Sequence, residues 1–218
     1  MRTETKEAVS IEAALKLAKP YVGSLRAKHP GSRPILKCAL VTGKYVIATD
    51  AHTLIRIEHN EIVSEPYLHH YKKWEESEHL TVNQYPQTER LIPQVGYEKD
   101  SGPVDVKEMY EAVTGAQVVS AQNEKVLDVY TRVQVTEDKI HVPDIVPGFQ
   151  TGEYTYRLDR LIPVTEETHF DGKYLVQVFK TFKQYRTALV DMYYYGPMRP
   201  IYLVGGPVEI ILLPCRRG

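Results

Sequence analysis

Residues 44–58 constrain the fold most, because two short apolar runs in this stretch flank a polar corner. The runs cover 45–48 and 54–57, and the corner between them reads Thr-Asp-Ala-His. Aspartate tolerates turn geometry, and its carboxylate can accept hydrogen bonds from the backbone that follows it. Short apolar runs bounded by such a turn are typical of paired strands. We therefore predict a β-hairpin with strands over 44–49 and 53–58.

Helical spacing appears in three parts of the chain. Apolar residues recur on one face in the segments 10–28, 104–115 and 171–185. Ser10 is a candidate cap for the first helix, and Pro20 is expected to kink or end it. Gly115 is expected to end the second helix. Residues 60–84 are charged and predict a long connection with little regular structure.

Strands are expected after each helix. Outside the central hairpin, the expected strands cover 35–41, 125–136, 139–146, 152–158, 187–195, 199–205 and 208–214. The chain therefore reads as a helix followed by three strands, three times over. The predicted fold class is α+β, with repeated units of one helix and antiparallel strands.

A weak internal echo agrees with a repeat. Residues 89–93 read Glu-Arg-Leu-Ile-Pro, and residues 159–163 read Asp-Arg-Leu-Ile-Pro. An echo of five residues can arise by chance, so it supports the repeat only weakly.

Composition bounds the class of protein. The 218 residues are 43% hydrophobic and 25% charged, which suits one or two globular domains. The net charge of −1 gives no overall attraction to DNA, so any nucleic-acid surface must be local. Cys38 and Cys215 are far apart, which favours free thiols in a reducing compartment. No apolar run reaches the roughly 18 residues of a membrane span, so we expect a cytoplasmic protein without a membrane partner.

No motif predicts catalysis. The sequence lacks a glycine-rich phosphate loop, a Gly-x-Ser-x-Gly elbow and a recognisable His/Cys/acid set. His69, His70 and His79 invite a metal interpretation, but no second ligand pair at zinc-like spacing accompanies them. We therefore expect no enzyme activity, no metal and no cofactor.

Three separated segments of the chain carry a resemblance to one protein family. Residues 49–54 read Thr-Asp-Ala-His-Thr-Leu, residues 85–93 read Tyr-Pro-Gln-Thr-Glu-Arg-Leu-Ile-Pro, and residues 211–216 read Ile-Leu-Leu-Pro-Cys-Arg. They resemble segments of the bacterial sliding clamps, the beta subunits of DNA polymerase III, in which the first segment is a Thr-Asp-Gly-His-Arg-Leu corner. Residues 85–93 resemble the family's interdomain linker Phe-Pro-Asp-Tyr-Arg-Arg-Val-Leu-Pro, and residues 211–216 resemble its ending, two apolar residues and Met-Pro-Met-Arg. The segments 11–58 and 173–203 resemble the opening half of its middle domain and the closing half of its last domain.

The resemblance implies two clamp-like domains and a surface pocket for partner peptides. Residues 1–98 would form an abbreviated domain with a linker, and residues 99–218 a domain similar to the family's last one. In the family, the corner, the linker and the C-terminus converge on a pocket that binds a short apolar peptide. Carried over, the pocket residues are Thr49, Ala51, His52, Leu54, Pro86, Arg90, Leu91, Ile211, Leu213, Pro214, Cys215 and Arg216. This chain departs from the family where Ala51 replaces a glycine, Thr53 an arginine and Cys215 a methionine. His52 by itself is more often a turn residue than a ligand contact.

The resemblance also implies contact with double-stranded DNA. Clamp helices line the DNA channel, and two predicted helices here carry a basic bias. The candidate DNA-binding residues are Lys16, Lys19, Lys173, Lys180 and Lys183. A solvated helix face is the ordinary alternative for such lysines.

Two functions follow from these patterns. The first is a homo-oligomeric, sliding-clamp-like processivity factor that binds polymerase or other clamp-binding peptides and encircles DNA weakly. The short chain would suit a phage or mobile-element version. The second is an interaction module that keeps the peptide pocket without forming a ring, and regulates or competes with a host clamp. Oligomeric state separates the two.

Overall fold

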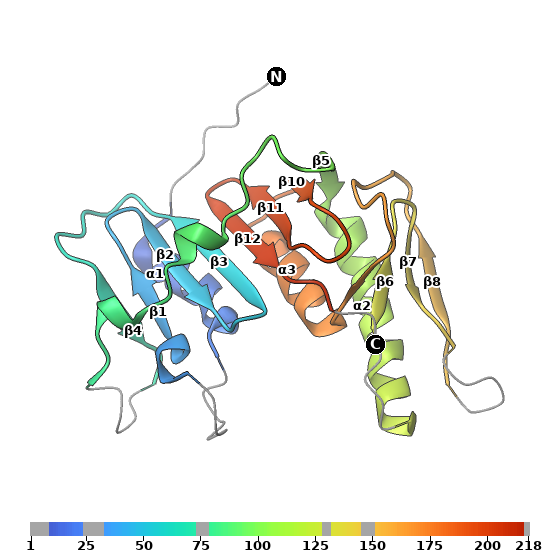
Figure 1. The fold of residues 1–218 in the computed structure, drawn as a ribbon, viewed down its shortest axis with the longest axis horizontal. Helices are drawn as coiled ribbons and strands as arrows, with labels where there is room; N and C mark the ends of the chain where they lie inside the picture. The colour runs from blue at the N-terminus through green and yellow to red at the C-terminus, as the bar shows by residue number, and fades with distance from the viewer. Residues whose placement is uncertain (1–8, 24–32, 73–78, 128–131, 145–150, 216–218) are drawn as a thin grey trace. The chain divides into compact units, whose positions relative to one another are not determined.

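The computed structural model describes residues 9–23, 33–72, 79–127, 132–144 and 151–215. They belong to two compact units, each drawn as part of the ribbon in Figure 1. Unit 1 comprises Met1–Ile92 with Gly206–Ile211, and unit 2 comprises Pro93–Gly205 with Leu212–Gly218. That residues 1–98 and 99–218 form separate domains stays a prediction. Within the described residues, no helix combines the length and apolar character needed to cross a bilayer.

Unit 1 contains a sheet with the strand order β4-β1-β2-β3-β12. The strands are β1 (Cys38–Val41), β2 (Tyr45–Thr49), β3 (Thr53–Glu58), β4 (Tyr67–His70) and β12 (Val208–Leu212). The first four pair in antiparallel fashion, and Ile47 of β2 stands opposite both Leu40 and Arg56. The last strand comes from the far end of the chain, so unit 1 is completed only when residues 206–211 return to it.

Each face of this sheet is covered by a different segment. Helix α1 (Ile11–Ala18) starts at Ser10, whose Oγ accepts a hydrogen bond from the Ala13 amide at 3.2 Å. Its buried alanines, Ala14 and Ala18, allow the helix to approach β2 and β3 closely. On the opposite face, Ile47 packs with Tyr85 and with Ile35 and Leu36, which precede β1. Short 3₁₀ turns complete the unit, at Lys19–Tyr21, Pro34–Lys37, Val82–Gln84 and Thr88–Leu91.

Unit 2 is built around two helices that pack on one another, α2 (Val106–Leu127) and α3 (Gly172–Gln184). The Asp171 carboxylate caps α3 by accepting a hydrogen bond from the Lys173 amide at 2.8 Å. Its apolar face is fully buried and consists of Leu175, Val178, Phe179 and Phe182. These four residues are the ones that helical spacing predicts.

Two groups of strands accompany these helices. One has the order β11-β10-β5, and the other has the order β8-β7-β6-β9. Their bounds are β5 (Asp100–Asp105), β6 (Val133–Val135), β7 (Lys139–Val142), β8 (Tyr154–Arg157), β9 (Thr168–Phe170), β10 (Leu189–Tyr194) and β11 (Ile201–Gly205). Every pairing with known register in this unit is antiparallel.

The predicted repeat of one helix and three strands is confirmed. Helix α1 precedes β1–β3, α2 precedes β6–β8 and α3 precedes β10–β12, while β4, β5 and β9 lie between the repeats. The α+β class is therefore correct. The hairpin over 44–49 and 53–58 and the helix over 171–185 lie within one residue of their observed bounds at each end.

Several element boundaries were predicted wrongly. The helical pattern over 10–28 gives a helix only to Ala18, followed by one 3₁₀ turn. The expectation that Pro20 ends the helix is confirmed, because proline cannot donate a helical hydrogen bond; residues 24–32 lie outside the described ranges. The strand over 35–41 begins as a 3₁₀ turn. The connection over 60–84 contains β4, and the strand over 125–136 shortens to β6 because α2 extends to Leu127.

Gly115 does not end the second helix; it lies inside α2. A side chain there would meet the ring of Tyr154, whose Cζ would be 2.6 Å from the added Cβ. The glycine therefore provides room for β8 to approach the helix. Glycine usually weakens a helix interior by about 1 kcal/mol, and this contact is the physical reason for it here.

Candidate functional site

The corner between β2 and β3 is organised by the Asp50 carboxylate. Its Oδ1 accepts three hydrogen bonds, from the His52 amide at 3.0 Å, the Thr53 amide at 2.8 Å and the Thr53 hydroxyl at 2.9 Å. Thr49 closes the other side, as its hydroxyl donates to the Thr53 carbonyl at 2.6 Å and accepts from the Ala51 amide at 3.2 Å. The predicted role of Asp50 in the turn is confirmed.

Ala51 occupies this corner with φ of 76°, in the left-handed region. A Cβ crowds the following carbonyl there, so glycine is the residue that the conformation favours. Ala51 is the position at which the clamp family has a glycine. The chain therefore keeps the backbone turn while carrying a side chain that the turn disfavours.

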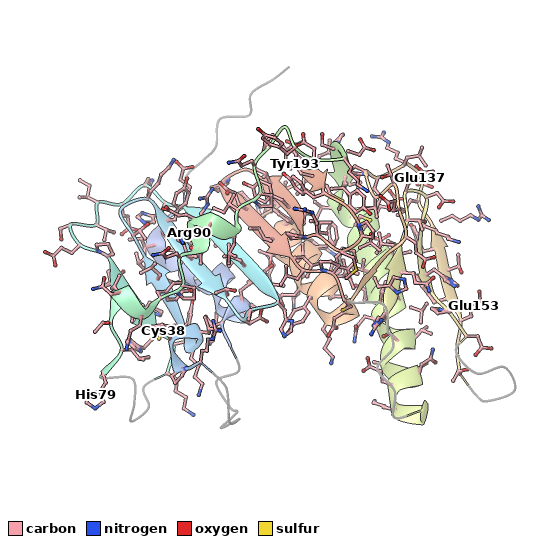
Figure 2. All side chains as sticks on the ribbon, in the orientation of Figure 1. Cys38, His79, Arg90, Glu137, Glu153 and Tyr193 are labelled. Carbon is pink, nitrogen blue, oxygen red and sulfur yellow. The ribbon has the colours of Figure 1, made fainter. Side chains whose placement is uncertain are left out.

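Unit 1 holds most of the predicted peptide-site residues. Thr49, Leu54 and Ile211 are buried, with only 4–5% of their surface exposed. Ala51, His52, Arg90 and Leu91 are exposed, and Pro86 is half-buried. Figure 2 labels Arg90 on the 3₁₀ turn that contains it. The buried members can support the wall of a peptide site, while the exposed members are the ones a partner could reach.

One tyrosine fastens the linker to the sheet of unit 1. The Tyr85 hydroxyl donates to the Ile47 carbonyl at 3.2 Å, two residues before the corner begins. The ring is buried against Ile35, Leu36 and Ile47. Burial is the main reason that the pKa of this phenol is raised well above 10. Pro86 follows directly, so the linker and β2 are held together inside this unit.

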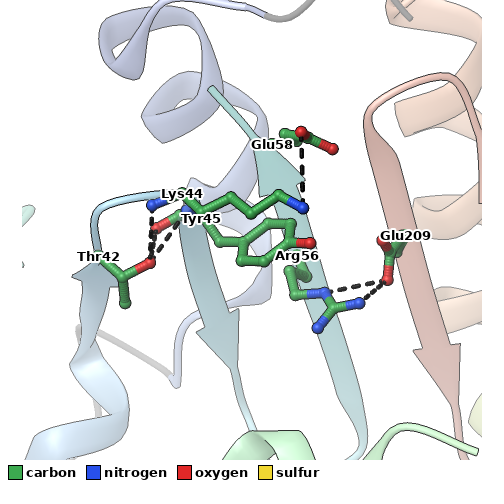
Figure 3. Close-up of polar contacts among 6 residues, drawn as sticks. All are labelled: Thr42, Lys44, Tyr45, Arg56, Glu58 and Glu209. Carbon is green, nitrogen blue, oxygen red and sulfur yellow. Dashed lines mark hydrogen bonds and ion pairs between the residues drawn. The ribbon is translucent and has the colours of Figure 1, made fainter. Parts of the chain in front are cut away.

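An ion pair inside unit 1 joins β3 to β12, and sequence reasoning missed it. Arg56 donates from Nε at 3.0 Å and from Nη2 at 2.5 Å to Glu209 Oε2 (Figure 3). The guanidinium also stacks on the Tyr45 ring, 4.4 Å from its centroid. Alternate strand residues share a face, so Ile211 lies on the face of Glu209, and Leu54 lies on the face of Arg56. The pair thus holds the strand that carries Ile211.

Unit 2 carries the C-terminal members of the predicted site. Leu213 is exposed, and Pro214 and Cys215 are half-buried, while Arg216 lies outside the described residues. The Cys215 amide donates to the His169 carbonyl at 2.7 Å, which attaches the tail to β9. Beside it lies a hollow of about 230 Å³ lined by Glu166, Glu167, His169, Pro197, Met198 and Cys215.

Most walls of this hollow were not predicted. Met198 is 59% exposed and lies with Pro197 in the turn between β10 and β11, which sequence reasoning treated only as a strand break. The signal was the Pro-Met pair inside a segment that already resembled the clamp's last domain. Glu167 pairs with His169 Nε2 at 2.9 Å, and Glu166 pairs with Lys99. The hollow therefore combines an apolar thioether with two carboxylates.

The predicted DNA-binding lysines lie on two helices or directly beside them. Lys173, Lys180 and Lys183 are exposed on α3, which has no acidic residue within Gly172–Gln184. The Lys183 ammonium lies 4.2 Å from the centroid of the Tyr110 ring, so the ring already contacts it. In unit 1, Lys16 pairs with Glu12 at 2.7 Å and Lys19 is exposed. Lys173 and Lys180 are thus the α3 lysines with the most accessible charge.

A cysteine and a histidine in contact could suggest catalytic chemistry or metal binding. Cys38 Sγ lies 3.4 Å from His70 Nδ1 in unit 1, and Figure 2 labels this cysteine. Burial raises the pKa of the Cys38 thiol to about 11, so it is protonated at neutral pH and a poor nucleophile. Across the described part of the chain, no three His, Cys, Asp or Glu side chains gather as metal ligands would.

Comparison with known proteins gives one consistent result. No family model matches the sequence, and no curated protein matches it. A DNA polymerase beta subunit from Streptococcus pyogenes aligns with 99% of this chain and 67% of its own, at 16% identity and a TM-score of 0.68. The Pseudomonas aeruginosa sliding clamp aligns with 94% of this chain and 64% of its own, at 15% identity and a TM-score of 0.65. The Caulobacter crescentus sliding clamp aligns with 94% of this chain and 62% of its own, at 14% identity and a TM-score of 0.68.

This chain spans about two thirds of the length of the clamps it matches. The match extends over both units rather than over one repeat. The chain therefore has the fold of the bacterial DNA polymerase sliding clamps, as the resemblance in its sequence predicts.

Proposed function

We propose that this protein is a clamp-like accessory factor of DNA replication, without catalytic activity of its own. The observation that carries the proposal is the alignment of 99% of the chain with a DNA polymerase beta subunit at a TM-score of 0.68. Three segments of the chain, the corner, the linker and the C-terminal strand, also resemble the clamp family in sequence. Its partners would be polymerase or other clamp-binding peptides and double-stranded DNA, and it would act as a homo-oligomer.

The peptide site would be centred on the C-terminal residues of unit 2. A Caulobacter crescentus clamp has a polyethylene glycol bound at a proposed beta-motif tethering region, so a clamp of this fold accepts a flexible ligand there. Here the hollow beside Cys215 has a volume of about 230 Å³ and an exposed thioether from Met198. Exposed Leu213 adds apolar surface. Apolar walls with a few polar groups are the usual composition of a site for a short apolar peptide.

A binding measurement tests this site. A labelled peptide with glutamine followed by spaced leucines and an aromatic residue should bind at micromolar strength, roughly −8 kcal/mol. Leu213→Asp should abolish binding, because a carboxylate on the apolar surface would have to lose its water. Val118→Asp is the matched control, since Val118 is a similarly exposed apolar residue on α2. Unchanged affinity in a folded Leu213→Asp variant would place the site elsewhere.

The DNA surface would be the exposed face of α3. Its three lysines have no acidic neighbour within the helix. Because the Lys183 ammonium already contacts the Tyr110 ring, we expect Lys173 and Lys180 to make the main phosphate contacts. Phosphate contacts release counterions, so affinity should fall by about 0.9 log units per log unit of salt for each phosphate neutralised. Affinity for linear duplex should be weak, because a ring holds DNA by topology.

Charge reversal tests this surface. Replacing Lys173, Lys180 and Lys183 with glutamate should weaken duplex binding and flatten its salt dependence. The matched control reverses three exposed basic residues outside the helices, Lys44, Lys72 and Arg157, with the same change in net charge. Equal losses in both triple variants would mean that only net charge matters. A wild type that binds peptide, remains monomeric and shows no salt-dependent DNA binding would replace the clamp proposal with the non-ring interaction module.

A further inference from the structure

Unit 2 has a second groove, on β5 and the loop after β8. Its volume is about 270 Å³, and its walls come from β5, the start of α2, the β6–β7 turn and the DRLIP loop (159–163). The Ile162 amide donates to the Glu137 carbonyl at 2.8 Å, which fastens this loop to the turn. Ile162 and Pro163 are buried. The floor of the groove is therefore buried, and its backbone is hydrogen-bonded to the β6–β7 turn.

The groove is acidic. Four carboxylates line it, from Asp100, Asp105, Glu108 and Glu137, and Arg160 contributes one guanidinium. Asp105 and Glu108 each use one oxygen locally, for the Glu108 amide at 2.9 Å and the Asp159 amide at 2.5 Å. Desolvation and then the carboxylates of Glu108, Asp159 and Glu111 raise the pKa of nearby Tyr156, which agrees with a negative potential here.

Two leucines make the groove apolar as well. Leu161 of the DRLIP loop is 68% exposed, and Leu189 at the start of β10 is 50% exposed. Exposed apolar side chains that share one groove rimmed by charge are a feature of interaction sites, whereas single exposed leucines are ordinary surface residues. An apolar anchor with basic neighbours would complement both features.

The edge of β5 does not favour an added strand. β5 is the last strand in its order, and the Val106 amide bonds to the Ala188 carbonyl at 3.0 Å. By alternation, residues 101, 103 and 105 then point their amides away from β10. The Ser101 amide is taken by Asp100 Oδ1 at 2.8 Å, and Pro103 has no amide hydrogen. Two of these three outward positions therefore offer no amide to a ligand, so we expect a ligand here to bind mainly through its side chains.

The sequence echo points to the same loop. The DRLIP loop differs only in its first residue from the Glu-Arg-Leu-Ile-Pro of residues 89–93, whose Arg90 and Leu91 belong to the predicted peptide site. In both copies the arginine and the leucine are exposed. The echo therefore presents the same pair of side chains twice, once in each unit.

We propose that this groove is a second docking site, which binds a basic segment of a partner protein that carries an apolar anchor. The anchor would pack between Leu161 and Leu189, and flanking lysines or arginines would face Glu137, Glu108 and Asp100. This site is separate from the hollow beside Cys215 and does not depend on DNA binding.

Peptide titration of the full chain tests the proposal. The probe is fluorescent Gly-Lys-Lys-Leu-Leu-Lys-Gly, with two control peptides in which glutamate replaces every lysine or serine replaces both leucines. The probe should bind at about 10–100 μM and weaken as salt rises, because rim charges are exposed. Both control peptides should bind at least roughly tenfold more weakly. Equal binding of all three peptides would overturn the proposal.

Matched variants locate the binding. Glu137→Lys should raise the Kd about fivefold or more, since it replaces an attraction with a repulsion. Glu153→Lys makes the same charge change at an exposed glutamate outside the groove lining and should have little effect; Figure 2 labels both residues. Leu189→Ser and Leu161→Ser should each weaken binding, and either one suffices if the other does not fold. Equal effects of the two glutamate variants would reduce the binding to net charge and overturn the site.

Two further readouts separate this groove from the hollow beside Cys215 and from a self-association surface. Probe binding should persist in Met198→Glu, which alters the hollow beside Cys215, so failure of that peptide site would leave this one measurable. Sedimentation gives the other readout. If Leu161→Ser abolishes self-association and the probe does not bind the wild type, then the occupant is a second copy of this chain, and the basic partner segment is excluded.

Discussion

Unit 1 and unit 2 both combine helices with antiparallel strands, but their distant segments are joined by different forces. In unit 1, β12 pairs with β3 in the sheet, and an ion pair between side chains that are 17% and 11% exposed reinforces this pairing beside the Tyr45 ring (Figure 3). In unit 2, two helices pack through fully buried aliphatic and aromatic residues. Removal of one partner is the change that most destabilises a partly buried charged pair. Packed helices are destabilised most by a change in the size or shape of a buried side chain.

The difference matters because unit 1 is completed by a strand from the far end of the chain. Arg56 and Glu209 are 153 residues apart, so closing this contact orders a long loop. Two guanidinium N–H groups of Arg56 donate to one Glu209 oxygen, and we expect this partly buried pair to favour β12 as the neighbour of β3. Unit 2 needs no such device, as α2, α3 and their strands are contiguous apart from the C-terminal tail. The comparison predicts that charge substitutions damage unit 1 and size substitutions damage unit 2.

The largest effect is expected at the ion pair. Glu209→Ala should lower the free energy of unfolding by about 2–4 kcal/mol, because it leaves the Arg56 guanidinium partly buried without its carboxylate. Urea unfolding of wild type and variant measures the change. Glu58→Ala is the control, because Glu58 makes only a long contact with exposed Lys44 at 3.8 Å, worth at most about 1 kcal/mol. Similar losses in both variants would mean that the buried pair has no special role.

The second effect tests shape in unit 2. Gly115→Ala should lower the free energy of unfolding by about 1–2 kcal/mol, since the new methyl group meets the Tyr154 ring. In a Tyr154→Ala background the same change should instead stabilise the helix by about 1 kcal/mol. The reversal of sign within this double-mutant cycle is the measurement. If Gly115→Ala stabilises both backgrounds, then the ring moves aside freely and does not restrict the helix.

How well the sequence predicts a feature depends on how far apart in the chain its interacting residues lie. Local signals sufficed for the hairpin at 44–58 and for α3, where turn chemistry and helical periodicity agree. Gly115 misled because a glycine in a helix pattern usually marks its end, and only Tyr154, 39 positions later in the sequence, explains it. β5 was missed because Gly102 and Pro103 disfavour strands and are tolerated at a sheet edge.

The candidate site likewise has parts that the sequence predicts and parts that depend on contacts between residues distant in the chain. The resemblance predicts a peptide site at the corner, the linker and the C-terminus, and the Tyr85 hydroxyl of the linker donates a hydrogen bond to Ile47 of β2. It did not single out His169 or Met198, although Met198 lies in a segment that carries the resemblance, because only the folded tail brings Cys215 beside them. The Arg56–Glu209 pair was equally invisible, since neither residue has a local pattern that marks its partner.

The third effect concerns the corner of unit 1. Asp50→Ala should lower the free energy of unfolding by about 1–2 kcal/mol, because three donors lose the oxygen that accepts from them. Asp50→Asn keeps an acceptor oxygen in the same place and should recover most of the loss. Thermal unfolding of the two variants side by side provides the measurement. An asparagine variant as unstable as the alanine variant would assign the effect to charge rather than to the hydrogen bonds.

The smallest effect is a gain in stability at the same corner. Ala51 has φ of 76°, a conformation that costs a residue with a Cβ about 1–2 kcal/mol. Glycine removes this cost but gives the unfolded chain more freedom, which offsets about 0.5–1 kcal/mol. Ala51→Gly should therefore stabilise the protein by about 0.5 kcal/mol, whereas Ala188→Gly, at an exposed alanine of unit 2 without positive φ, should destabilise it by a similar amount. Opposite signs in urea unfolding would confirm that the corner is strained. A loss of stability in both variants would show that the hydrogen bonds of Asp50 and Thr49 hold the turn at no cost from the Ala51 side chain.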